Sequence, residues 1–164
     1  MDKCVDLCHN IDRMVKGKSM LMYERTIEHA QFLARHFGKD KIQYAVSAVL
    51  FELKVPMKGS AFDYILNAVI ISFADPIMPV VKGLYPTIGS MYNPTIGSKQ
   101  IEETIRSAIK YAWKERDDDV WSLYFRPDRN GEFKKPSNAE FIRSVMRFIK
   151  LWHGCCKEAV NCEK

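Results

Sequence analysis

The sequence lacks the features of secreted, membrane-spanning and common catalytic proteins. Its 164 residues contain no apolar run near the roughly 20 residues that span a bilayer, and charges interrupt the N-terminal stretch where a signal peptide would be apolar. The patterns Gly-x-x-x-x-Gly-Lys, Gly-x-Ser-x-Gly and His-Glu-x-x-His are absent, so the usual phosphate-binding, hydrolase and zinc-protease sites are not indicated. We expect a cytoplasmic protein that binds no membrane, is not an enzyme and needs no cofactor.

Cysteine is scarce and confined to the two ends of the chain. The five cysteines are Cys4, Cys8, Cys155, Cys156 and Cys162. An odd number without a secretory signal favours reduced thiols over a disulfide framework. A metal site that joins the termini, with His9 as a further ligand, is the alternative, but the spacings match no standard zinc pattern. The sequence therefore predicts thiols and no metal.

No segment carries a large excess of charge of one sign. The net charge is +5 at neutral pH, and hydrophobic residues make up 47% of the chain. This hydrophobic fraction is typical of a folded protein, and the modest positive charge permits an anionic partner without requiring one. The length suits one domain, or one domain with a helical extension.

Apolar residues recur at helical spacing along most of the chain. The spacing predicts helices over residues 20–37, 40–53 and 61–73, a short one from 117 to 125, and a last one that follows Ser137 and ends at Gly154. Ser137 and Glu140 have the Ser-x-x-Glu spacing of a capping box, and the aspartates at 117–119 suit a helix N-terminus. His29 and His36 are predicted to pack or to face solvent. No segment has a clear strand pattern.

The stretch from Pro79 to Arg116 predicts two helices joined by a tight turn. Asn93-Pro94 and Gly97 mark the break, and Ser98 is a candidate N-cap of the second helix. That helix carries its apolar residues on one face, namely Ile101, Ile105, Ala108, Ile109, Ala112 and Trp113. The periodicity alone favours an ordinary surface helix, and a helix-turn-helix is the more specific alternative.

Several motifs, in order along residues 42–152, resemble those of a known family. Residues 84–93, Leu-Tyr-Pro-Thr-Ile-Gly-Ser-Met-Tyr-Asn, are similar to its signature Leu-Tyr-Pro-x-Ile-Ala-x-x-Tyr-Asn, and residues 135–142 to its segment Lys-Pro-Thr-Asn-Ser-Glu-Phe-Ile. Smaller matches are Val55-Pro56, Phe62 with Tyr64, Ile105-Arg106, Ala108-Ile109 and Ala112-Trp113. The chain thus resembles the C-terminal DNA-binding effector domain of the master transcription regulator of sporulation initiation in endospore-forming bacteria.

The resemblance implies an all-α effector domain of about six helices over residues 42–153, preceded by a helical extension, 1–41, and followed by a tail, 154–164. It also implies a transcription regulator whose helix at about 98–115 enters the major groove of double-stranded DNA. Family members bind as paired domains and contact RNA polymerase, so a homodimer and that polymerase are expected partners. The expected DNA-binding residues are Ser98, Lys99, Gln100, Glu103, Arg106, Ser107, Lys110 and Lys114.

Arg106 matches a family arginine, and its guanidinium can fork to guanine or hold a phosphate. Other positions depart from the family. Ser90 and Met91 replace usual lysines, Gln100 and Glu103 replace usual arginines, and the turn is about two residues longer. These departures support an alternative, a protein-interaction or dimerisation module that keeps the fold but has lost sequence-specific DNA binding. Too few residues precede the matched region for the family's phosphoacceptor receiver domain, so control by aspartyl phosphorylation is not expected.

Overall fold

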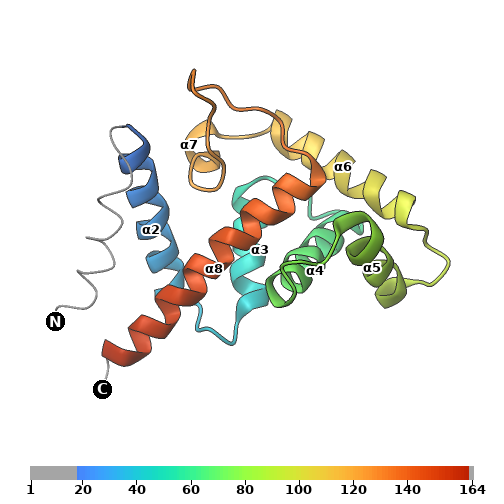
Figure 1. Cartoon of the computed structure of the whole chain (residues 1–164), viewed down its shortest axis with the longest axis horizontal. Helices are drawn as coiled ribbons and strands as arrows, with labels where there is room; N and C mark the ends of the chain where they lie inside the picture. The colour runs from blue at the N-terminus through green and yellow to red at the C-terminus, as the bar shows by residue number, and fades with distance from the viewer. Residues whose placement is uncertain (1–17, 163–164) are drawn as a thin grey trace.

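The computed structural model describes residues 18–162, and over that range every regular element is helical (Figure 1). The elements are α2 (Lys18–His36), α3 (Ile42–Glu52), α4 (Ala61–Ala74), the π-helical turn η1 (Val80–Leu84), α5 (Tyr85–Tyr92), α6 (Ser98–Lys114), α7 (Asp118–Trp121) and α8 (Asn138–Cys162). The predicted all-α fold is confirmed. None of these helices combines the length and the apolar character needed to cross a lipid bilayer.

The long helix α8 is the central element, and α2, α3, α4 and α6 all pack against it (Figure 1). Its buried stripe includes Phe141, Ile149 and Trp152, which have essentially no solvent exposure. Ala30 and Leu33 of α2 belong to the same core cluster. The helix that precedes the family-like region therefore shares one hydrophobic core with it.

The prediction that the last helix ends at Gly154 was wrong, because α8 continues to Cys162. Glycine inside a helix costs only about 1 kcal/mol relative to alanine. Beyond Gly154 the apolar stripe goes on from Trp152 to Cys156, which is buried. Its packing outweighs the cost of the glycine.

The cysteine predictions are only partly within the described range. The Sγ atom of Cys156 lies 3.5 Å from the carbonyl oxygen of Phe37, and burial raises the pKa of this thiol. Cys155 is partly buried on the same helix. Cys4 and Cys8 lie outside the described residues, so the absence of a metal site between the termini stays a prediction.

Two predicted helix starts have the expected hydrogen bonds. The backbone N–H of Ser137 donates to Glu140 Oε2 at 2.8 Å, and the N–H of Glu140 donates to Ser137 Oγ at 3.3 Å, which confirms the capping box. Asp117 Oδ1 accepts from the N–H groups of Asp119 and Val120 at 2.9 and 3.4 Å. The helix that follows Asp117 is shorter than predicted, because α7 ends at Trp121 and residues 122–124 form turns.

A polar cluster joins α2 to the rest of the molecule. His29 Nε2 lies 2.9 Å from Glu52 Oε2 and 2.9 Å from the hydroxyl of Tyr124, and that hydroxyl donates to Glu52. Thr26 Oγ1 adds a hydrogen bond to the carbonyl of Leu123 at 3.0 Å. Three segments far apart in the sequence thus meet at one carboxylate.

The pKa of Glu52 reflects this cluster. Burial acts to raise the pKa, but the hydrogen bonds from His29 and Tyr124 and the charge of His29 lower it, and the net direction is down. Burial, together with the neighbouring carboxylate, raises the pKa of Tyr124 far above its usual value, so its hydroxyl stays protonated and donates. The ionised form of Glu52 is therefore the one that the fold stabilises.

We expect Glu52→Gln to lower the free energy of unfolding by about 1–3 kcal/mol near pH 7, because a charged acceptor is lost. The loss should shrink as the pH falls below the ordinary glutamate value of 4.5, where wild-type Glu52 becomes protonated as well. Urea denaturation followed by circular dichroism from about pH 7 to about pH 3 measures it. Glu28→Gln, on the exposed side of α2, is the control, and a pH-independent difference would contradict the assignment.

Candidate nucleic-acid interface

The helix α5 is entered through η1, a turn wider than an α-helix. The N–H of Leu84 donates to the carbonyl of Pro79 at 3.0 Å, five residues back, which defines the π-helical turn. Pro86 lies just after this turn and has no N–H to donate to the carbonyl of Lys82. In a regular α-helix its ring would also clash with that carbonyl. The wide turn accommodates this proline, so the first of the two predicted helices consists of η1 followed directly by α5.

Side chains fix the turn between α5 and α6 where it leaves α5. Asn67 Nδ2 donates to the hydroxyl of Tyr92 at 2.6 Å, and the Tyr92 ring meets that of Tyr64 edge-on. Asn93 Oδ1 accepts from the N–H of Thr95 at 3.0 Å and from its hydroxyl at 2.8 Å. Such a side-chain bond to the backbone two residues on stabilises a turn.

The expected N-cap of α6 is displaced by one residue. Gly97, with an extended backbone, occupies the N-cap position, and its carbonyl accepts from the N–H groups of Gln100 and Ile101 at 3.0 and 3.3 Å. Ser98 is the first residue of the helix and therefore follows the N-cap position. The prediction that Ser98 caps the helix was wrong, because the turn already supplies a residue with the required backbone conformation.

Gly89 allows the turn to approach α5 closely. A Cβ atom at this position would lie 3.0 Å from the carbonyl oxygen of Ile96 and 3.3 Å from Ile101 Cδ1. The missing side chain leaves space for the turn to lie against α5.

The helix α6 has a buried face and an exposed face. Its buried residues are Ile101, Ile105, Ala108, Ile109 and Ala112, as the apolar stripe predicts, and they pack toward α4, α5 and α8. Seven of the eight predicted DNA-binding residues are exposed, namely Lys99, Gln100, Glu103, Arg106, Ser107, Lys110 and Lys114, whereas Ser98 is partly buried. At 100° per residue, Lys99, Glu103, Lys110 and Lys114 share the centre of the outer face.

Two arginine side chains on or next to α6 are already paired with other groups of the protein. Arg106, whose side chain is 56% exposed, forms an ion pair with Glu102 one turn earlier. Arg116 is held at the end of the helix, where it bonds Asp118 Oδ1 at 2.7 Å and the carbonyl of Trp113 at 2.9 Å. The net charge on the outer face is therefore only modestly positive.

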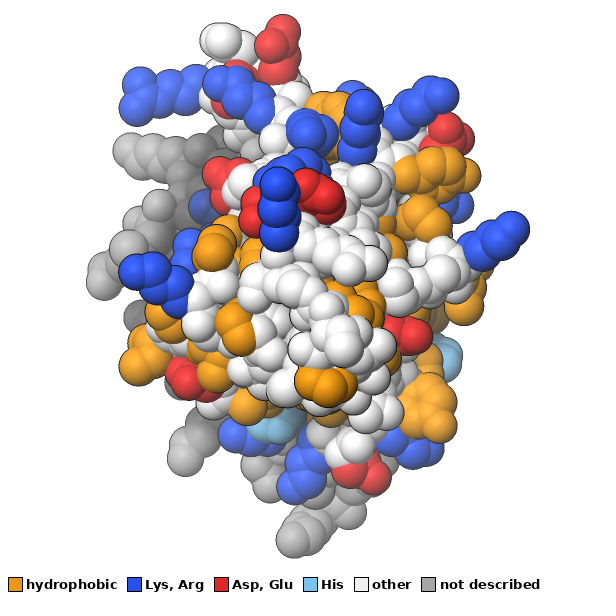
Figure 2. Space-filling view, turned by 90° about the vertical axis from the view of Figure 1, so that its right-hand side faces the viewer, with side chains coloured by type: hydrophobic (Ala, Val, Ile, Leu, Met, Phe, Trp, Pro, Cys, Tyr) orange, Lys and Arg blue, Asp and Glu red, His pale blue; other side chains and the backbone are white. Residues whose placement is uncertain are grey.

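Figure 2 views the molecule from the side on which the turn joins α5 and α6. Basic side chains gather along its upper edge with acidic ones between them, and the middle carries few charges. A surface of this kind attracts a polyanion weakly and tolerates other partners.

The start of α8 is attached to α6 by a contact that the sequence did not reveal. Asn138 Nδ2 donates to the hydroxyl of Tyr85 and to the carbonyl of Glu102, both at 3.0 Å. Beside this contact lies a groove of about 520 Å³, lined by η1, by α6 near Arg106 and by residues 135–140. The match at residues 135–142 signalled that the segment was important, but not that it contacts α6.

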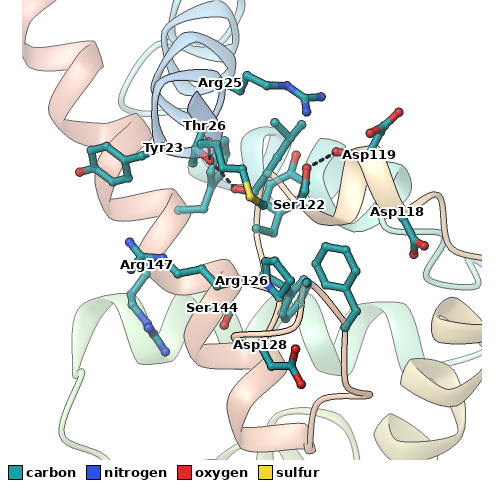
Figure 3. Close-up of a pocket in the computed structure, with 18 of the residues that line it drawn as sticks. Tyr23, Arg25, Thr26, Asp118, Asp119, Ser122, Arg126, Asp128, Ser144 and Arg147 are labelled. Atoms are coloured by element: carbon teal, nitrogen blue, oxygen red, sulfur yellow. Dashed lines mark hydrogen bonds between the residues drawn. The ribbon is translucent and has the colours of Figure 1, made fainter. Parts of the chain in front are cut away.

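A larger hollow, of about 1130 Å³, lies between α2, residues 118–133 and α8 (Figure 3). Arg126 and Arg147 lie on one side of it, and Asp118 and Asp119 lie on the other. Among the described residues no group of histidine, cysteine and acidic side chains is placed to hold a metal ion. Charges of both signs on its walls indicate no single class of ligand.

Comparison with known protein families gives a match over residues 46–149. The matching family is described as "Sporulation initiation factor Spo0A C terminal". The matched range includes α4, η1, α5, α6 and α7 entirely, most of α3, and α8 as far as Ile149. It contains every expected DNA-binding residue and excludes α2.

We expect Gly154→Ala and Gly89→Ala to differ in their effect on stability. Gly154 is exposed in α8 with open space at its Cβ position, so alanine should raise the free energy of unfolding by about 1 kcal/mol. At Gly89 the added methyl would press on the carbonyl of Ile96, so this gain should be absent. Urea denaturation of both variants tests the close approach, and equal gains would contradict it.

Proposed function

The chain belongs to the family of the Spo0A C-terminal domain, a DNA-binding effector domain of a sporulation regulator, and on that premise we propose that it regulates transcription by placing α6 in the major groove of double-stranded DNA. The N-terminal turns of α6 would meet base edges through Gln100, whereas Glu103 would face the phosphates. Lys99, Lys110 and Lys114 would hold phosphates along the groove.

The observation that carries the proposal is the exposure of the outer face of α6 beside a family match that spans the whole of α5 and α6. The opposite face of α6 is buried, so the helix has only one side to offer a partner. Arg106 lies at the edge of this side. To contact DNA it must exchange its ion pair with Glu102 for a base or a phosphate.

A protein-interaction module is the second candidate. It is favoured by Glu103 at the centre of the outer face, by the neutralised Arg106 and by the exposed ring of Tyr111, which is 53% accessible. Such a surface suits a protein partner as well as a duplex. Pairing of two chains and a contact with RNA polymerase, both implied by the resemblance, stay predictions.

The central test is fluorescence anisotropy with family-type and random duplexes from low to physiological salt. We expect tighter binding to the family-type duplex, with affinity falling as salt rises. Arg106→Ala should weaken specific binding by about 1–3 kcal/mol. If Arg106 reads a base, the loss of affinity should depend on the base pair at one position of the duplex. If it holds a phosphate, the loss should be the same for all duplexes. Arg35→Ala, on the exposed side of α2, is the control.

The outcomes separate the two candidates. Absence of binding to any duplex at low salt would rule out the DNA-binding proposal. Equal, salt-sensitive binding to all duplexes would leave a nonspecific binder and would count against sequence readout.

We expect Glu103→Gln to strengthen binding to every duplex, because it removes a negative charge from the face that would meet phosphates. The gain should be largest at low salt, where screening is weakest. The same titrations measure it, with Glu28→Gln as a control of equal charge change on α2. An unchanged affinity would mean that Glu103 does not face DNA.

A further inference from the structure

We propose that the segment Arg129–Lys135, between α7 and α8, forms a second contact with the DNA backbone and holds phosphates on the strand beside the groove that α6 enters. The proposal rests on the proposed function and adds a surface that sequence comparison did not assign. Its cations are Arg129, Lys134 and Lys135.

The position of this segment is set by α6 itself. The contact of Asn138 with the carbonyl of Glu102 attaches the chain to the second turn of α6, only three residues after Lys135. Lys135 and Arg106 line the same groove of about 520 Å³. A phosphate strand that runs along the edge of α6 would therefore pass both side chains.

The segment has a defined backbone. Asp128 Oδ1 accepts from the N–H groups of Asn130 and Glu132 at 2.9 and 3.0 Å, and the N–H of Asp128 donates to the carbonyl of Glu132 at 2.8 Å. Gly131, with φ of 80°, supplies the left-handed residue that this tight loop needs. An ordered loop presents its cations at lower entropic cost than a disordered one.

The cations of the segment are less tightly paired than Arg106 of α6. Lys134 forms a long ion pair with Asp128, with Nζ to Oδ2 at 4.0 Å, and its side chain is 83% exposed. Within the described part of the chain, Arg129 and Lys135 have no acidic partner. By contrast, Arg106 is paired with Glu102.

Figure 1 shows the segment at the top of the molecule. The chain between α7 and α8 rises above α7 and then descends beside the C-terminal end of α6 to the start of α8. The upper edge is also where basic side chains gather in Figure 2. Cations here would add phosphate contacts to those of the lysines on the outer face of α6, where Gln100 and Glu103 supply none.

The test compares the wild-type protein with the double variant Lys134→Ala/Lys135→Ala in the same anisotropy titrations. Each lysine that holds a phosphate should reduce the slope of log affinity against log salt by about 0.9, so the double variant should lose up to about 1.8. The loss should be the same for family-type and random duplexes, because phosphates carry no sequence.

The matched control is Lys39→Ala/Lys41→Ala, which removes the same charge from the exposed connection between α2 and α3 at the opposite edge of the molecule (Figure 1). This variant should keep the wild-type slope. Thermal denaturation of both variants verifies that the fold is intact, and Arg129→Ala is a second, single change in the same loop.

The failure of this inference differs from the failure of the proposed function. If the wild-type protein binds DNA and the slope of the Lys134→Ala/Lys135→Ala variant is unchanged, the inference is wrong and the function stands. A loss limited to one duplex sequence, or an equal loss in the control variant, would also overturn it. If the wild-type protein binds no DNA, both fail.

Discussion

The burial of the apolar stripe of α8 against four other helices is the constraint on which the rest of the structure depends. Each large apolar side chain that this packing removes from water contributes about 1.5–3 kcal/mol, so Phe141, Ile149 and Trp152 together outweigh any single surface contact. Because α6 packs against α8, α4 and α5, only one rotation of α6 about its axis buries its apolar stripe in the core. The outer face of α6 is thus oriented by the core and not by the charges it carries.

In this fold the residues that orient α6 are not the residues that determine what its outer face can bind. The buried face of α6 is held by the core, whereas its outer face carries Gln100 and Glu103 beside its lysines. In the DNA-binding function that we propose, a helix with so little positive charge would need phosphate contacts from neighbouring elements to hold it in the groove. The loop before α8 is the neighbour whose position relative to α6 is fixed by a direct hydrogen bond, that of Asn138 to Glu102.

Local signals in the sequence predicted the helices well, since periodicity and the capping box at Ser137 depend on residues close together in the chain. Local signals also produced the errors at Ser98 and Gly154, where a neighbouring turn and continued core packing decided the helix ends. The cluster around Glu52 was not predictable, because its partners lie 23 and 72 residues away. Such contacts follow only from tertiary packing. For the same reason, the sequence could indicate which residues of α6 are exposed, but not which segment lies beside them.

The turn between α5 and α6 depends on a glycine in the helix that precedes it. The carbonyl of Ile96 comes so close to α5 that a Cβ atom at position 89 would lie 3.0 Å from it. An alanine would fill that space, and glycine removes the obstacle at a cost of about 1 kcal/mol in helix propensity. The turn can therefore lie against α5 while α5 and α6 stay packed together. It follows that the residues of the outer face of α6 are carried on a well-packed helix pair, and that the side chains of this face decide what it can bind.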